Sequence, residues 1–488
     1  MAERLAFKSQ QSFLEKISMG ATGTRRVFAD LASQGHDPLE LERGSRSFKI
    51  WKQVKIKRIR VPDILCVDCA TRIESRAKRS LEISMSHSLS DPERGWDNGL
   101  RDNDFVALVV CERSGNRPVD WQADTLVQYV SVRDMRGARD AGQALLMRPK
   151  GAEEGFEQRI NWPAAVASAS GTVVDVSRDR LQYRRLRDNR IISLRLRAKG
   201  ITLSPLVQPC DQIVRNQVLA AVVPVRRRFT CSKTTSARYY IDQLSSLELS
   251  ERYAAAKALQ RFRSPEAVDA LAQEIANRSE HLYVRLEAAA SLAQQGDRLG
   301  WDLINQCLAH PYLQNRLEAV IVLGEIQSDI SRQMLADVLL DRSQHPEIRA
   351  AAAWALGELR DKVALAALIQ SFTAVDEVIR VEAARALAKL ALGSTPELIQ
   401  ELATSSPNVR PGVAWALAEA GQFSVQDVLG ALVDDDTRRW VSYIVGVQPP
   451  DRYVHEIEQL RKRDPEVYFA VTVLWKIMSS WIYRLEEY

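Results

Sequence analysis

The sequence predicts a multidomain α+β protein with a basic, β-rich N-terminal half followed by an all-α solenoid of helical repeats. Three observations support this prediction. The chain has 488 residues, too many for a single compact core. An arginine-centred apolar segment, clearest at residues 348–359, recurs every 30 to 33 residues through the second half. Charge also divides the chain, because residues 1–244 carry 42 Lys and Arg against 28 Asp and Glu, whereas residues 245–488 carry 25 against 34.

From these shifts we expect four parts. They are a helical segment at 1–43, a β-rich basic domain at 44–150, a small barrel-like β domain at 151–240 and the solenoid at 245–488, which ends in a capping helix. Apolar residues make up 46% and charged residues 26% of the chain, as in soluble globular proteins. Six cysteines without an apolar N-terminal run predict a reducing, cytoplasmic location and no membrane span.

The N-terminal segment contains two glycines at residues 20–26, just before an apolar helical stretch. This pattern predicts a junction between two helices. The alternative is an anion-binding turn at a helix start.

Residues 43–60 form an unrelieved basic run in which apolar residues alternate with lysine and arginine. Alternation predicts strands with one basic face, and Trp51 adds an aromatic ring that can stack on a base. A solvated charged face is the alternative. The candidate nucleic-acid-binding residues here are Lys49, Lys52, Lys55, Lys57, Arg58 and Arg60.

A second basic region lies at residues 178–199, followed by three arginines at 226–228. Apolar segments at 171–176 and 205–220 bracket it and resemble the barrel-sandwich hybrid of lipoyl carriers and RNA polymerase subunits. No lysine stands at a carrier tip, so we expect phosphate-backbone binding instead. The candidate residues, whether for DNA or RNA, are Arg184, Arg185, Arg187, Arg226, Arg227 and Arg228.

Residues 61–84 place a Pro-Asp pair at one expected strand and carboxylates with a lysine on the next. This resembles the PD-(D/E)xK nuclease superfamily, in which adjacent strands hold Mg²⁺. The resemblance implies that Asp63 is the first ligand, that Glu74 or Glu82 is the second and that Lys78 supplies the cation. Two departures oppose it: Glu74 and Lys78 are four residues apart rather than two, and Ser84 stands where a lysine would follow Glu82.

Cys66 and Cys69 have the spacing of a zinc knuckle. Because no second pair with this spacing follows, a zinc ion would need remote ligands, for which His87 and Cys111 are the candidates. Ordinary thiols at a turn are the alternative.

In the repeats, apolar residues recur one position before each arginine and three and seven positions after it. At 100° per residue these positions form one stripe of a helix. The pattern resembles HEAT repeats, in particular the alanine-rich kind named after phycobilisome lyases. The resemblance implies that the arginines tie neighbouring repeats together, and the candidate acidic partners are Asp341, Glu347, Asp376 and Glu377. Deoxyhypusine hydroxylases share the repeat but use several His-Glu pairs for iron, whereas this chain has only His455-Glu456.

The fifth position after each arginine points away from this stripe, into the expected groove of the solenoid. It is occupied by Trp354, Arg385 and Trp415, and the acidic residues Glu358 and Glu419 lie nearby. An acidic groove repels a phosphate backbone, so we expect a protein partner there. The alternative is that the tryptophans pack along their own helices.

Together these observations predict an adaptor that binds a protein through its solenoid and nucleic acid through its basic half. A subunit of a bacterial DNA-processing or defence assembly would fit this description. A magnesium-dependent nuclease with a HEAT scaffold is one alternative, and a phycobilisome-lyase-like protein or chaperone is another.

Overall fold

The computed structural model describes residues 10–45, 59–88, 91, 95–115, 119–147 and 158–485. These residues divide into two compact units, one extending to Ser291 and the other beginning at Leu292. The first unit is rich in β-strands and also contains the first helical repeats, whereas the second is helical. The predicted order of a β-rich half followed by a helical solenoid is confirmed.

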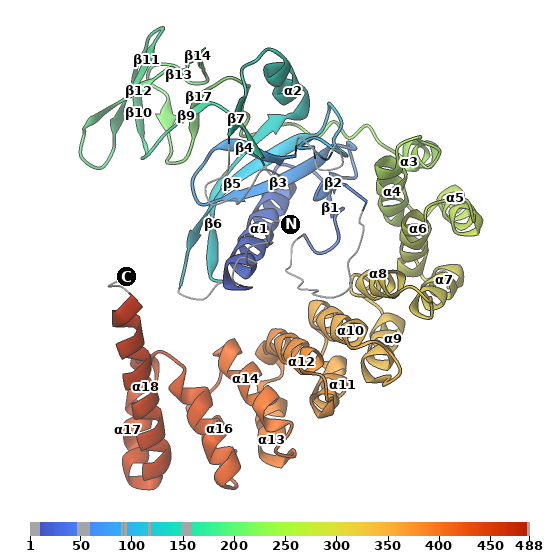
Figure 1. Ribbon diagram of the computed structural model, residues 1–488, viewed down its shortest axis with the longest axis vertical. Helices are drawn as coiled ribbons and strands as arrows, with labels where there is room; N and C mark the ends of the chain where they lie inside the picture. The colour runs from blue at the N-terminus through green and yellow to red at the C-terminus, as the bar shows by residue number, and fades with distance from the viewer. Residues whose placement is uncertain are drawn as a thin grey trace, which may run out of the picture. The chain divides into compact units, whose positions relative to one another are not determined.

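A five-stranded sheet organises the first unit (Figure 1). Its strands are, in spatial order, β1 (Pro38–Glu40), β2 (Ile64–Cys66), β3 (Arg72–Lys78), β5 (Phe105–Arg113) and β6 (Trp121–Ser131). Neighbours are antiparallel except β3 and β5, which run parallel. The connection between β3 and β5 therefore has to return across the sheet, and it carries β4 (Ile83–His87) on the way.

Helix α1 (Gln10–Ser33) packs on one face of this sheet. Val27 and Leu31 are fully buried there in one core with Ile73 and Tyr129. Residues 20–26 continue the helix without a break, so the predicted junction, and with it the anion-binding turn, is wrong. Gly23 instead allows close packing, because a Cβ at this position would lie 2.5 Å from the Cβ of Ala77 on β3.

This contact predicts opposite effects for two glycines of the same helix. Gly20→Ala should raise the free energy of unfolding by about 0.5–1 kcal/mol, since alanine favours the helix and nothing lies within 4 Å of its Cβ. Gly23→Ala should lower it by about 1–3 kcal/mol, because the new methyl group overpacks the contact with Ala77. Urea denaturation of both variants checks this, and equal effects would contradict the packing role of Gly23.

The other face of the sheet is covered by α2 (Val132–Asp140) and by a small sheet. The small sheet has the order β4-β8-β7, with β7 at Leu145–Met147 and β8 at Gln158–Trp162. The core on this side is built from fully or almost fully buried residues of β4, β5, β6, α2 and β8: Ile83, Met85, Val106, Leu108, Val130, Met135 and Trp162.

A smaller β subdomain follows, with its own apolar core. Three short sheets build it, in the orders β12-β11-β10-β16, β15-β17-β9 and β13-β14. Tyr183 and Leu181 are fully buried in its centre. The strands are β9 (Ala164–Val166), β10 (Gly171–Val176), β11 (Arg180–Arg185), β12 (Ile191–Arg195), β13 (Arg197–Ala198), β14 (Ile201–Thr202), β15 (Ser204–Pro205), β16 (Gln212–Ile213) and β17 (Val218–Ala221).

The rest of the chain is helical, and among its described residues no helix combines the length and apolar character needed to cross a bilayer. The helices are α3 (Ala237–Gln243), α4 (Leu249–Ala258), α5 (Pro265–Ala276), α6 (Leu282–Gln294), α7 (Arg298–Leu308), α8 (Leu313–Leu323), α9 (Asp329–Leu340), α10 (Pro346–Leu359), α11 (Leu365–Gln370), α12 (Glu377–Leu390), α13 (Thr395–Thr404), α14 (Arg410–Ala420), α15 (Val425–Leu429), α16 (Asp435–Gly446), α17 (Val454–Arg463) and α18 (Pro465–Leu485).

In the second unit the helices α8, α10, α12, α14, α16 and α18 pack against one another in succession. Their small residues permit this: Ala352 and Ala383 are fully buried, and a Cβ on Gly357 would lie 2.7 Å from the Cα of Ala386 on the next helix. Proline at the first helical turn, as at Pro346, fixes where a helix begins. Buried small residues thus let successive helices of the second unit pack closely.

The repeated arginines bind groups at the ends of helices. Arg349 Nε donates to the carbonyl of Leu339 at 2.8 Å, and Arg380 donates to the carbonyl of Ala374 at 2.7 Å. Arg410 lies 3.0 Å from Asp434, the N-cap of α16 in the next repeat. Main-chain carbonyls left open at helix ends, as well as acidic residues, are therefore their partners.

Candidate functional site

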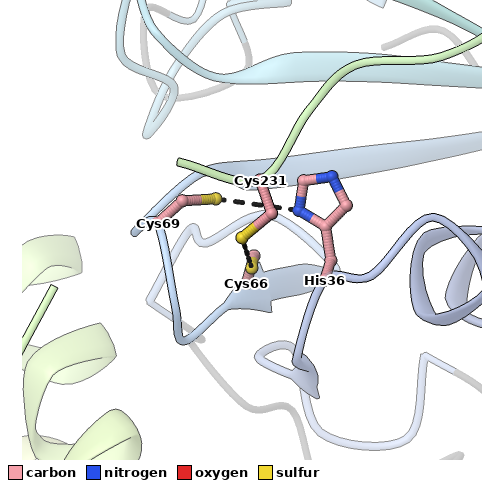
Figure 2. A group of neighbouring side chains, drawn as sticks. All are labelled: His36, Cys66, Cys69 and Cys231. Atoms are coloured by element: carbon pink, nitrogen blue, oxygen red, sulfur yellow. Dashed lines mark hydrogen bonds between the residues drawn. The ribbon is translucent and has the colours of Figure 1, made fainter. Parts of the chain in front are cut away.

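Four metal-binding side chains meet at the edge of the five-stranded sheet (Figure 2). Cys66 ends β2, Cys69 lies in the turn to β3, His36 follows α1, and Cys231 lies on the segment after the small β subdomain. One ligand atom from each residue lies within 4.8 Å of those of the other three. His36 and Cys66 are buried, and the other two are half-buried.

The structure brings together only half of the zinc ligands expected from the sequence. Cys66 and Cys69 are neighbours, but His87 and Cys111 lie elsewhere: His87 Nδ1 accepts a hydrogen bond from the Trp96 N–H, and Cys111 is buried in the core under α1. Cys231 was missed because it is 165 residues from Cys66, and no local spacing marks a ligand so remote. His36 lies only 33 residues before Cys69, and it was missed because no motif links it to the cysteines.

The shared environment moves the pKa values of these thiols apart. A hydrogen bond with Cys66 lowers the pKa of Cys69 to about 3, with further hydrogen bonds from His36 and Thr71. The same hydrogen bond with Cys69, together with burial, raises the pKa of Cys66. These shifts favour the charged form of Cys69 over that of Cys66, and Cys69 Sγ lies 3.7 Å from His36 Nδ1.

Two of the expected nuclease carboxylates, Asp63 and Glu74, lie near each other at the start of β3. Asp63 is 8% exposed, and its Oδ2 accepts a hydrogen bond from the main-chain N–H of Ser75 at 2.7 Å. Burial raises the pKa of both carboxyl groups, and the charge of Glu74 raises that of Asp63 further. Glu74 forms an ion pair with Arg76 at 2.8 Å.

The other two expected catalytic residues form a separate group at the end of β3. Lys78 Nζ donates to the carbonyl and the hydroxyl of Ser84 at 3.0 and 2.6 Å, and lies 3.4 Å from Glu82. Burial lowers the pKa of Lys78 to about 8. Throughout the described part of the chain, the histidine and cysteine group is the one set of three or more metal-binding side chains, so Asp63, Glu74 and Glu82 do not converge. This geometry gives the nuclease interpretation no support.

Most of the first basic run, namely Lys49, Lys52, Lys55, Lys57 and Arg58, lies outside the described residues. Arg60 is exposed and donates to the carbonyl of Gly95 at 2.9 Å. The side chains of Arg226, Arg227 and Arg228 are exposed, while the main chain of Arg226 pairs with Tyr129.

The second basic region forms the hairpin of β11 and β12. Arg184 and Arg187 are exposed, and Arg185 forms an ion pair with Asp188. That pairing also lowers the pKa of Asp188 to about 2. On the outer face, Arg180 lies directly opposite Arg195 on the neighbouring strand. The hairpin therefore presents a basic face of which Asp188 neutralises only a part.

The expected groove of the solenoid is less open than the sequence suggested. Trp354 is 5% exposed, because α10 is packed by α8, α9 and α12, and the prediction that its side chain is displayed is wrong. Trp415 and Glu419 are half-buried. Glu358 pairs with Lys389 of the next repeat, and Arg385 pairs with Glu382 on its own helix.

The fold of the helical part defines a class of repeat scaffold protein, an α-solenoid made from helical pairs. Family comparison names the repeat: residues 301–388 and 367–445 match HEAT repeats, and residues 251–276 match the PBS lyase HEAT-like repeat. HEAT and HEAT-like repeats are thus present within residues 251–445, as predicted. No curated protein matches the chain in sequence.

The solved structures that match this chain have low sequence identity and low TM-scores. The complex of CpcE and CpcF of phycocyanin lyase from Nostoc is 21% identical with a TM-score of 0.26, and the match covers 53% of this chain and 99% of that one. Human deoxyhypusine hydroxylase is 18% identical with a TM-score of 0.20, covering 43% and 83%. The HEAT-like repeat protein of Thermococcus onnurineus is 17% identical with a TM-score of 0.25, covering 45% and 99%.

Proposed function

We propose that this protein is a scaffold whose HEAT repeats bind a protein partner and whose β11–β12 hairpin binds the phosphate backbone of a nucleic acid. The observation that carries the proposal is the face of the hairpin, where Arg180 and Arg195 stand directly opposite each other. Like charges placed opposite one another on adjacent strands destabilise a hairpin. A bound polyanion would remove this cost.

The rest of the hairpin supports contact with a nucleic acid. Arg184 and Arg187 extend the basic face toward the turn. Leu186 and Ile191 are 65% and 52% exposed there, and apolar side chains beside arginines suit the sugars and base faces of a nucleic acid. Phosphate contacts position the chain on the backbone without selecting a sequence, so we expect little sequence preference.

A protein partner fits the exposed side of α12 and α14 on the solenoid. Val378 and Val381 are 37% and 39% exposed on α12, two turns and one turn before Arg385 respectively. Trp415 occupies the matching position on α14, which packs beside α12. Aromatic and arginine side chains next to exposed aliphatic ones are typical of binding hot spots. A protein joining such a partner to nucleic acid would serve a DNA-processing or defence assembly.

The nucleic-acid part of the proposal is tested by measuring affinity against salt concentration. Each phosphate contact with duplex DNA contributes a slope of about −0.9 in log affinity against log salt. The variant with both Arg184→Ala and Arg187→Ala should therefore bind more weakly, with the slope reduced in magnitude by about 1.8. Fluorescence anisotropy with labelled duplex DNA, single-stranded DNA and RNA of several sequences gives these slopes.

The matched control removes two exposed arginines from the solenoid. Arg298 and Arg439 are 93% and 73% exposed in side-chain area, and replacing both by alanine changes the net charge by the same amount. Unchanged affinity and slope in this control, with loss in the hairpin variant, support the hairpin as the interface. Equal loss in both variants would show only nonspecific attraction by net charge, and no binding by the parent protein would refute the proposal.

A further inference from the structure

We propose that Cys66, Cys69, Cys231 and His36 bind one structural zinc ion. The site shares no residue with the β11–β12 hairpin, and it does not depend on the function proposed above. Three thiolates and an imidazole are the ligands of structural zinc, and they disfavour magnesium and calcium, which prefer oxygen.

The spacing of the ligand atoms matches a tetrahedral zinc site. Zinc bonds of about 2.3 Å to sulfur and about 2.0 Å to nitrogen place two sulfurs of a tetrahedron about 3.8 Å apart, and a sulfur and a nitrogen about 3.5 Å apart. Here Cys66 Sγ lies 3.8 Å from Cys231 Sγ, and Cys69 Sγ lies 3.7 Å from His36 Nδ1 (Figure 2). A disulfide between Cys66 and Cys231 would require about 2.05 Å.

The imidazole of His36 is oriented for metal binding through Nδ1. Its other nitrogen, Nε2, lies 3.1 Å from the carbonyl oxygen of Phe229. A carbonyl only accepts hydrogen bonds, so Nε2 carries a proton, and Nδ1 is the ring nitrogen on the side of the sulfurs. Zinc would take the place of the proton that Nδ1 shares with Cys69. A hydrogen bond from the second ring nitrogen to a carbonyl is the usual support for a zinc-binding histidine. The ring of Phe229 also packs against the imidazole, with centroids 4.6 Å apart.

The turn that carries Cys66 and Cys69 is fixed by its main chain. The N–H of Cys66 donates to the carbonyl of Thr71 at 2.8 Å, which closes the turn. Ala70 has a positive φ of 54° directly after the second cysteine. Such a conformation is uncommon for alanine, and here it turns the chain back into β3.

Residues 229–235, which we call the strap, hold Cys231 over this turn. Phe229 stacks on Phe105 with ring centroids 4.9 Å apart, which anchors the start of the strap on β5. At its end, the N–H of Thr235 donates to the carbonyl of Asp68 at 3.1 Å, and its hydroxyl donates to the carbonyl of Val67. Protein ligands can therefore fill all four positions, which defines a closed, structural site rather than a catalytic one.

The full-length protein, purified without chelator, should contain one zinc ion per chain by elemental analysis. Cys231→Ser and His36→Asn should each lose most of it. The matched controls are Cys111→Ser and His87→Asn, which change the same residue types outside the site and should keep the metal. If the first two variants fail to fold, cobalt exchanged into the parent protein decides the question, because three thiolates give strong sulfur-to-cobalt charge-transfer absorption and tetrahedral d–d bands.

Metal loss in the two site variants alone, or the cobalt spectrum of a tetrahedral three-thiolate site, supports the proposal. Parent protein without bound metal and without that cobalt spectrum overturns it. So does full metal content in Cys231→Ser, which would place the ion on other ligands. A mass two hydrogens lower under non-reducing conditions would reveal a disulfide in its place.

Discussion

Asp104→Asn is expected to lower the free energy of unfolding of the β-rich unit by about 3–5 kcal/mol. Asp104 is fully buried and Arg72 is 1% exposed, and their side chains are 2.7 Å apart. Asp104 also accepts hydrogen bonds from the main chain and the guanidinium of Arg101. An arginine cannot lose its proton to escape burial, so the amide would leave a positive charge unpaired in the core. Urea denaturation measures the change in the free energy of unfolding. Faster hydrogen exchange in β3 and β5 would show that the loss of stability lies there.

The control is Glu112→Gln, the same chemical change near the end of β5. Glu112 lies 2.9 Å from Arg215, and both side chains are more than half exposed. Solvent screens such a pair, so the control should cost less than about 1 kcal/mol. Similar losses in the two variants would mean that burial of the Arg72 and Asp104 pair does not govern its contribution.

Glu287→Gln is expected to lower the free energy of unfolding by a comparable amount, about 3–5 kcal/mol. The loss should fall on the first repeats. Glu287 is 2% and Arg43 is 6% exposed, and they form an ion pair between α6 and the segment after β1. The charge of Glu287 is thus compensated by Arg43 inside the first unit. Thermal unfolding together with hydrogen exchange in α6 measures the loss.

Two comparisons test whether the loss of stability in Glu287→Gln comes from the unpaired charge that remains buried. Glu397→Gln breaks a pair with Lys362 in which both side chains are about half exposed, and it should change stability by less than about 1 kcal/mol. The double variant with Arg43→Met and Glu287→Leu removes both charges and should recover most of the loss, since apolar replacements of a buried pair are often tolerated. A double variant as unstable as Glu287→Gln would contradict the electrostatic explanation.

The helical repeats were predictable because their signal is local. An arginine and its apolar stripe fit within one helix, and the same pattern returns after 30 to 33 residues. The exposure of Trp354 was not predictable in this way, because it depends on how closely α8, α9 and α12 pack around α10. Periodicity identifies the face of a helix but does not tell how much of that face its neighbours cover.

The candidate metal site was also only partly predictable, because it depends on contacts between segments that are distant in sequence. Cys66 and Cys69 are three residues apart and could be paired from spacing alone. His36 and Cys231 reach them only after the chain has built α1, the five-stranded sheet and the small β subdomain. His87 and Cys111 are suitable metal ligands by residue type. The pairing of β4 with β8 and of β5 with β6, however, places these two residues away from Cys66 and Cys69.

The strap has a further consequence, for the order in which the chain acquires its structure during synthesis. Phe229 contacts His36 across 193 residues, so the β-rich unit cannot close until the strap has left the ribosome. The later repeats join residues that are near in sequence, as Arg410 and Asp434 do across 24 positions. Local contacts form quickly and distant ones slowly. The N-terminal sheet therefore stays open, and accessible to chaperones, until the strap has emerged, whereas the later repeats, which follow the strap in the sequence, can assemble one by one as they are made.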